Sequence, residues 1–154
     1  MTMKTVPKEE MTSAVGTKFE PSAWIEITQD RINNFADCTE DHQFIHVDEE
    51  AAAQTPFGST IAHGLLTLSL LPKMIEGQGV IPENLVMGLN YGFDKVRFLA
   101  PVRVGKRVRG NIEVLSVDQK DDNRFLIKQG ISVEIEGEET PALVAEWLNM
   151  MVCG

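Results

Sequence analysis

Residues 63–75 read HGLLTLSLLPKMI, and this stretch decides the fold. Apolar side chains fall on all sides of a helix drawn through it, interrupted only by Thr67, Ser69 and Lys73. A helix of this composition is expected to be buried, because it has no polar face to offer solvent. Pro72 has no backbone N–H to donate, so it should kink or shorten the helix.

The sequence after Pro82 changes to the pattern of β-strands. Four segments of about ten residues or more alternate partly between apolar and polar side chains, and turn residues separate them. These segments are Leu85–Phe98, Arg107–Val117, Arg124–Ile135 and Leu143–Val152. Long antiparallel strands curl, and one helix of about thirteen residues can fill the concave side. The sequence therefore predicts an α+β domain in which a curved antiparallel sheet wraps round a central helix.

The residues before this helix predict shorter elements. Residues 22–27 alternate partly and indicate a strand, and Thr28 is a suitable N-cap for a helix that reaches about Thr39. Asp48 is a suitable cap for a second, short helix, so residues 41–46 should form the loop between the two. Residues 1–20 have weak periodicity and indicate a loosely ordered arm, which leaves 21–154 as the folded domain.

Composition excludes several classes of protein. The 154 residues suit one domain, and 43% hydrophobic with 24% charged residues is ordinary for a folded chain. A net charge of −9 works against a nucleic-acid-binding surface. No apolar stretch approaches the roughly 20 residues of a membrane span. The N-terminus lacks the apolar core of a signal peptide, so we expect a cytoplasmic protein.

Two smaller features have ordinary interpretations. Cys38 and Cys153 are too few for a disulfide framework and form no metal-binding pair, so we expect idle thiols. Six of the fourteen basic residues lie within residues 95–109. Most of these should be solvated strand and turn positions, although an anionic ligand could also use them. Arg97 is the exception among them.

Asp41 and His46 are the strongest candidates for chemistry. All three histidines lie between residues 42 and 63, and histidine is suited to proton transfer near neutral pH. A carboxylate and an imidazole five positions apart can hold one water between them if the chain leaves helical geometry. Two simpler roles remain open, because Asp41 could cap its own backbone and His46 could bond to nearby backbone.

The pair His63-Gly64 opens the apolar stretch. We expect His63 to be a structural histidine at the start of the helix, with a direct catalytic role as the alternative. Gly64 would present an unpaired N–H at the positive end of the helix, which suits an oxygen that gains negative charge. Close packing alone could also require this glycine.

Two strings together resemble a known family. Residues 41–48 (DHQFIHVD) and 58–71 (GSTIAHGLLTLSLL) are similar to the MaoC-like dehydratases, which include (R)-specific enoyl-CoA hydratases and a nodulation-protein-N-like group. His63 follows His46 by seventeen residues, as the family pattern requires. The resemblance covers roughly residues 22–150. The sequence departs from the pattern at Glu40, Gln43 and Phe44, where the family usually has Gly, Asn and Pro.

The resemblance implies a hot-dog fold, a homodimer and a reaction. That reaction is the reversible hydration of a trans-2-enoyl thioester to an (R)-3-hydroxyacyl product, with acyl-CoA or acyl carrier protein as the carrier. It implies that Asp41 and His46 hold the water and that Gly64 N–H binds the thioester oxygen. No cofactor is expected. A metal bound by Asp41, His42, His46 and His63 is conceivable but unnecessary, because hydration of an activated alkene needs none.

Three further residues are candidates for substrate binding. Gln43 keeps the amide of the usual Asn and could supply a supporting hydrogen bond. Ser69 could line an acyl tunnel, or simply belong to the core. Arg97 could contact a CoA phosphate or stabilise a dimer through an ion pair.

Two other functions remain possible. A hot-dog thioesterase would hydrolyse acyl-CoA with a carboxylate base. A non-catalytic subunit would bind acyl thioesters, although such a protein has no use for a carboxylate–imidazole pair.

Overall fold

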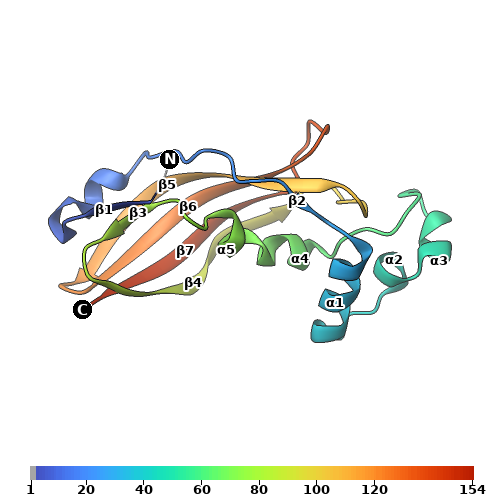
Figure 1. The fold of residues 1–154 in the computed structure, drawn as a ribbon, viewed down its shortest axis with the longest axis horizontal. Coiled ribbons are helices and arrows are strands. Elements are labelled where there is room, and N and C mark those ends of the chain that lie inside the picture. The colour runs from blue at the N-terminus through green and yellow to red at the C-terminus, as the bar shows by residue number, and fades with distance from the viewer. Residues whose placement is uncertain (1–2) are drawn as a thin grey trace.

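Five antiparallel strands form the main sheet of the computed structural model, which describes residues 3–154 (Figure 1). Their order is β2-β5-β6-β7-β4, and their bounds are β2 Ile25–Glu26, β4 Leu85–Phe98, β5 Arg107–Asp121, β6 Arg124–Ile135 and β7 Leu143–Cys153. The four long strands confirm the strand prediction, and β5 continues beyond its expected end at Val117. The strand expected at residues 22–27 shortens to β2. The curved sheet with its helix is the hot-dog fold, of the α+β class.

The concave face of the sheet carries the core. Along β6, side chains alternate between buried and partly exposed, so that Phe125, Ile127, Ile131 and Val133 all point inward. Inward residues of β5 and β7 extend this apolar surface. Burial of these side chains removes most of their apolar area from water, which is the main source of stability of such a domain.

The central helix is divided into two short ones, α4 Gly64–Ser69 and α5 Leu71–Met74. Pro72 lies in the first turn of α5, which confirms that it shortens the helix. One face of this helical pair is buried through Leu66, Leu71 and Met74. Leu65 on another face is 59% exposed. The expectation of burial on all sides is therefore wrong for a single copy of the chain. Across residues 3–154, no helix is long and apolar enough to cross a membrane.

A glycine in β5 lets α5 lie close to the sheet. A Cβ on Gly110 would lie 3.0 Å from Met74 Sδ and 3.1 Å from Met74 Cβ. A larger residue here would therefore require Met74 to shift by a few tenths of an ångström. This close approach fixes the position of α4 as well, because α4 is joined to α5 through Leu70 alone.

Three helices lie beyond one end of the sheet (Figure 1). They are α1 Gln29–Thr39, α2 Phe44–Val47 and α3 Glu49–Ala53. The predicted caps are present, since the Thr28 hydroxyl accepts the Arg31 N–H and the Asp48 carboxylate accepts the Ala51 N–H. The prediction of a loop at residues 41–46 is partly wrong, because the second half of this segment forms α2. The His46 N–H donates to the carbonyl of Gln43 at 2.9 Å and starts this single turn.

The N-terminal segment is attached to the domain, unlike the loosely ordered arm that we expected. Residues 1 and 2 lie outside the described part of the chain. Strand β1 Lys4–Val6 pairs in parallel with β3 Val80–Pro82, and a 3-10 helix, η1, spans Lys8–Ala14. Met11 is fully buried, and Val6, Ala14 and Phe19 also belong to the core. The apolar side chains of this segment are spaced irregularly, so the sequence shows no strand or helix period that would indicate its attachment to the core.

The two edges of the sheet differ. Residues 16–22 run along β5, and the N–H groups of Gly16, Phe19 and Ser22 donate to β5 carbonyls. This segment and β2 cover that edge. Strand β4 forms the other edge and pairs only with β7 among residues 3–154. Exposed apolar side chains gather on and next to β4, namely Val86, Met87, Leu89, Tyr91, Phe93, Phe98 and Leu99.

Candidate active site

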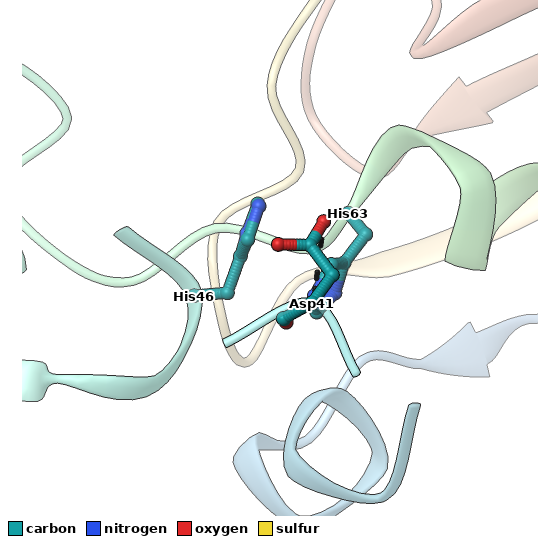
Figure 2. Close-up of side chains that lie close together, drawn as sticks. All are labelled: Asp41, His46 and His63. Carbon is teal, nitrogen blue, oxygen red and sulfur yellow. Dashed lines mark hydrogen bonds and ion pairs between the residues drawn. The ribbon is translucent and has the colours of Figure 1, made fainter. Parts of the chain in front are cut away.

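Three segments meet where the helical group joins the central helix. Asp41 follows the end of α1, His46 lies in α2, and His63 is the N-cap residue of α4. One ligand atom from each side chain lies within 4.8 Å of the others. Figure 2 shows one oxygen of the Asp41 carboxylate directed toward the His46 ring. The structure thus brings together the two residues that the sequence predicted, together with His63.

Asp41 is placed by an unusual backbone turn. Helix α1 ends at Glu40, which has φ of 61° in the left-handed region that favours glycine. The turn directs the next residue back toward α4. The Asp41 carboxylate accepts the Gln43 N–H at 3.3 Å, and its side chain remains 54% exposed. The expected backbone cap and the approach to His46 therefore occur together.

His46 is buried and its tautomer is fixed. Its Nδ1 lies 2.7 Å from the carbonyl oxygen of Ile61. A carbonyl oxygen only accepts, so Nδ1 carries the proton and Nε2 of the neutral ring has a free lone pair. Burial lowers the pKa of His46, and the nearby His63 lowers it further, whereas the Ile61 hydrogen bond and Asp41 partly offset this. His46 is therefore neutral near pH 7 and can accept a proton at Nε2.

His63 supports Asp41 and stacks on His46. Its Nε2–H donates to the backbone carbonyl of Asp41 at 2.9 Å and lies 4.0 Å from the carboxylate. Its ring lies 3.8 Å from the His46 ring, centroid to centroid, at an interplanar angle of 22°. Nδ1 of His63 is buried and has no hydrogen-bond partner among residues 3–154. The expected structural role is consistent with these contacts, which also place His63 inside the site.

Asp41, His46 and His63 are also a possible metal-binding group by composition. Imidazole lone pairs lie in the plane of the ring, and the two rings are stacked face to face. Such lone pairs run side by side rather than converging on one ion at the roughly 2.0 Å of a Zn–N bond. This arrangement fits a shared water better than a metal. His42 does not belong to this group: it lies on the surface, with its Nε2 2.8 Å from Oδ1 of Asp37.

Gly64 and His46 line the same cavity. Its volume is about 320 Å³, and Thr67, Phe98 and Leu143 also contribute to its wall. Gly64 is the first residue of α4, so its N–H has no partner within the helix. A Cβ at this position would lie 2.8 Å from Cδ1 of Phe98. Close packing against Phe98 therefore requires glycine here, whereas any residue other than proline would supply the N–H.

The other sequence candidates lie further out. The Gln43 side chain is exposed and makes no cap hydrogen bond, whereas its backbone contacts Asp41 and His46. Ser69 is exposed and its hydroxyl donates to the Leu65 carbonyl, and it lines a second cavity of about 290 Å³ together with Phe93 and Trp147. Arg97 is exposed on the edge strand β4, next to Phe98.

Sequence reasoning missed the polar contacts behind His46. Gln29 Nε2 donates to the His46 carbonyl at 2.8 Å, and the Thr60 hydroxyl donates to Gln29 Oε1 at 2.5 Å. The segments that carry these residues are far apart in the sequence, and neither residue belongs to a recognisable motif. A glutamine that directly follows a helix N-cap is an ordinary surface residue in most helices.

Comparison with known proteins shows the family of this chain. Residues 10–135 match the family described as MaoC like domain. The chain is 46% identical over 148 residues to nodulation protein N of Rhizobium meliloti (strain 1021), covering 95% of this chain and 91% of that protein. It is 45% identical over 137 residues to 3-hydroxyacyl-thioester dehydratase Z of Mycobacterium tuberculosis (strain H37Rv), covering 89% and 90%.

Among solved structures, a monoamine oxidase regulatory protein from Archaeoglobus fulgius superposes with a TM-score of 0.79 at 25% identity, covering 100% of this chain and 99% of that one. The superposition covers the whole of both chains, so the two proteins share the hot-dog fold. The chain belongs to the MaoC-like dehydratase family.

Proposed function

We propose that this protein catalyses the reversible hydration of trans-2-enoyl-CoA to (R)-3-hydroxyacyl-CoA. One observation carries the proposal: His46 and Gly64 line one cavity, and the Asp41 carboxylate lies beside the His46 ring. A base and an oxyanion donor thus face the same space. Membership of a dehydratase family and the likeness to a 3-hydroxyacyl-thioester dehydratase support the reaction class.

The water would lie between Asp41 and His46. Two groups that share one water lie about 4.5 Å apart at ordinary hydrogen-bond lengths, and a ligand atom of Asp41 and one of His46 lie within 4.8 Å of each other. Nε2 of neutral His46 and the Asp41 carboxylate both accept, so the water donates both hydrogens to them. Its lone pair then points outward, to the substrate.

The reaction adds the water across one double bond. The oxygen attacks C3 while the Asp41–His46 pair removes a proton, and the pair delivers a proton to C2. Both atoms arrive from the same side, since one pair handles both. The N–H of Gly64 would donate to the thioester oxygen, which gains negative charge as the C–O bond forms. No step requires a cofactor or a metal.

The test is the loss of absorbance of crotonyl-CoA on hydration. Replacing Asp41→Asn or His46→Ala should lower kcat about 10²–10⁴-fold, the usual contribution of general acid–base catalysis. His42→Ala is the matched control, because this histidine is a surface residue paired with Asp37, and it should keep nearly full activity. Near-wild-type rates in either site variant would overturn the assignment. Release of free thiol, detected with a thiol-reactive dye, would indicate a thioesterase instead.

We also propose that the protein is a homodimer formed along β4. This edge has unpaired backbone groups and exposed apolar side chains, whereas the β5 edge is covered. Pairing of β4 with a second copy would satisfy both. Arg97 lies on this strand, so it would contact either the dimer partner or a CoA phosphate. Acyl carrier protein remains the alternative carrier.

A further inference from the structure

Gln29 connects three parts of the chain through one amide group. It is the first residue of α1 and is half-buried. Its Nε2 donates to the His46 carbonyl at 2.8 Å and to Asn33 Oδ1 at 2.9 Å, while Oε1 accepts from the Thr60 hydroxyl at 2.5 Å. The His46 carbonyl only accepts, so the amide can adopt just one orientation here. Thr60 is 1% exposed, which keeps water away from its hydroxyl.

Thr60 directly precedes the residue that fixes the His46 tautomer. The Ile61 carbonyl accepts Nδ1–H of His46, and the Ile61 N–H donates to the Ile45 carbonyl at 3.0 Å. Residues 60–62 are themselves held by 102–104, through hydrogen bonds from Val104 to Thr60 and from Ala62 to Val102. Gln29 thus bonds to the His46 backbone at one end and, at the other, to the segment that receives the His46 ring.

We propose that Gln29 and Thr60 form a positioning pair for His46. They hold its backbone and the Ile61 carbonyl at the distance that keeps the proton on Nδ1 and the lone pair on Nε2. Neither residue lines the cavity, so both would act through His46. The inference rests on the proposed function for its effect on rate, but its structural content can be measured without any substrate.

The direct measurement is the ¹⁵N spectrum of the imidazoles at pH 8, without substrate. His46 should show the Nδ1–H tautomer and His63 the Nε2–H tautomer, because each donates to a carbonyl through that nitrogen. In Gln29→Met the His46 signals should shift to a mixture of tautomers, because Gln29 no longer ties the His46 backbone to the segment that carries the Ile61 carbonyl. His63 bonds to a different segment and serves as an internal reference.

Thr60 provides a second pair of variants that preserves the packing. Thr60→Val keeps the shape and removes the hydroxyl, whereas Thr60→Ser keeps the hydroxyl. Thr60→Val should reproduce the tautomer mixture, and Thr60→Ser should keep the Nδ1–H form. Gln54→Met is the control for Gln29→Met, because Gln54 is an exposed glutamine at the end of α3. Its spectrum should match the wild type.

Kinetics give the second readout. Gln29→Met and Thr60→Val should lower kcat roughly 10–100-fold, as for other groups that orient a functional imidazole, with little change in KM. Combined, the two changes should cost little more than one alone, because they break the same network. An unchanged Nδ1–H tautomer in folded Thr60→Val or Gln29→Met protein would overturn the positioning role. Absence of hydratase activity in the wild type would instead refute the proposed function and leave the spectrum as the deciding test.

Discussion

At the scale of single residues, the site combines a buried imidazole with an exposed carboxylate. His46 is 7% exposed and the Asp41 side chain 54%. Burial removes the water that would stabilise a charged imidazolium, so His46 stays neutral, whereas solvent can stabilise the charge of Asp41. The two groups can therefore both accept hydrogen bonds from one water at neutral pH.

The lowered pKa of His46 predicts how activity and stability depend on pH. Activity should be level near pH 7 and fall only when the medium becomes acidic enough to protonate Nε2, below the ordinary histidine value of about 6.5. A kcat/KM profile from pH 5 to 8 would measure this. A midpoint above 6.5 would contradict the assigned environment.

The same shift affects folding. Below about pH 6.5 the unfolded chain protonates this histidine while the folded chain does not, so the unfolded state binds more protons and stability falls as pH falls. Above that range both states are neutral and the contribution disappears. Denaturant unfolding at pH 7.5 and 5.5 should show a smaller pH dependence in His46→Gln than in the wild type. An equal pH dependence would argue against a buried neutral His46.

Glu40 occupies a backbone conformation that side chains disfavour. A left-handed φ costs a residue with a Cβ roughly 1–2 kcal/mol, and glycine adopts it freely at some entropic cost. Glu40→Gly should therefore stabilise the fold by about 0.5–1 kcal/mol, which raises Tm by a few degrees. Glu40→Ala keeps the Cβ and removes the charge, so it is the matched control and should gain nothing. Equal Tm values for the two variants would contradict the strain argument.

At the scale of elements, the sequence predicted the strands and helices whose apolar residues repeat with a regular period. The alternation along β6 and the turn residues around it were sufficient to place the four long strands. The division of α4 from α5 followed from Pro72. The N-terminal segment was not predictable, because Val6, Met11 and Phe19 reach the core from a strand, a 3-10 helix and an irregular edge, which share no common period.

The candidate site, too, was predictable from the sequence only in part. The spacing of Asp41, His46 and His63 and the resemblance to a family singled out three residues that the structure brings together. The supporting contacts of Gln29 and Thr60 were not predictable, since they join residues 31 positions apart. Ser69 was expected to face inward from its helical position, and it borders a cavity with Phe93 and Trp147 while remaining exposed.

Helix η1 should contribute to stability as a part of the core. Met11 is fully buried, and truncation of a buried methionine to alanine typically costs 2–5 kcal/mol through lost burial and the cavity left behind. Met11→Ala should therefore lower the free energy of unfolding by about this amount in urea titrations. Met3→Ala, at a residue that is 50% exposed, should change it little. A Met11→Ala protein as stable as the wild type would indicate that η1 detaches from the sheet in solution.

At the scale of the whole molecule, the difference between the two sheet edges predicts the oligomeric state. A long apolar edge strand that stays unpaired favours aggregation, and pairing with a second copy removes this hazard. Light scattering should give twice the mass of one chain. Leu89→Lys with Tyr91→Lys should reduce it to one chain, because two charges would enter the β4 contact. Val15→Lys places a charge on an apolar residue of comparable exposure away from β4, and it should leave the dimer intact.

The placement of the two thiols offers a reporter without any engineering. Cys38 is exposed near the end of α1, three residues before Asp41, whereas Cys153 is buried at the end of β7. A fluorophore that reacts with thiols would therefore attach to the helical group that Figure 1 shows beyond the end of the sheet. A change in its emission when an acyl thioester is added would report, in the unmutated protein, that this group responds to the proposed substrate.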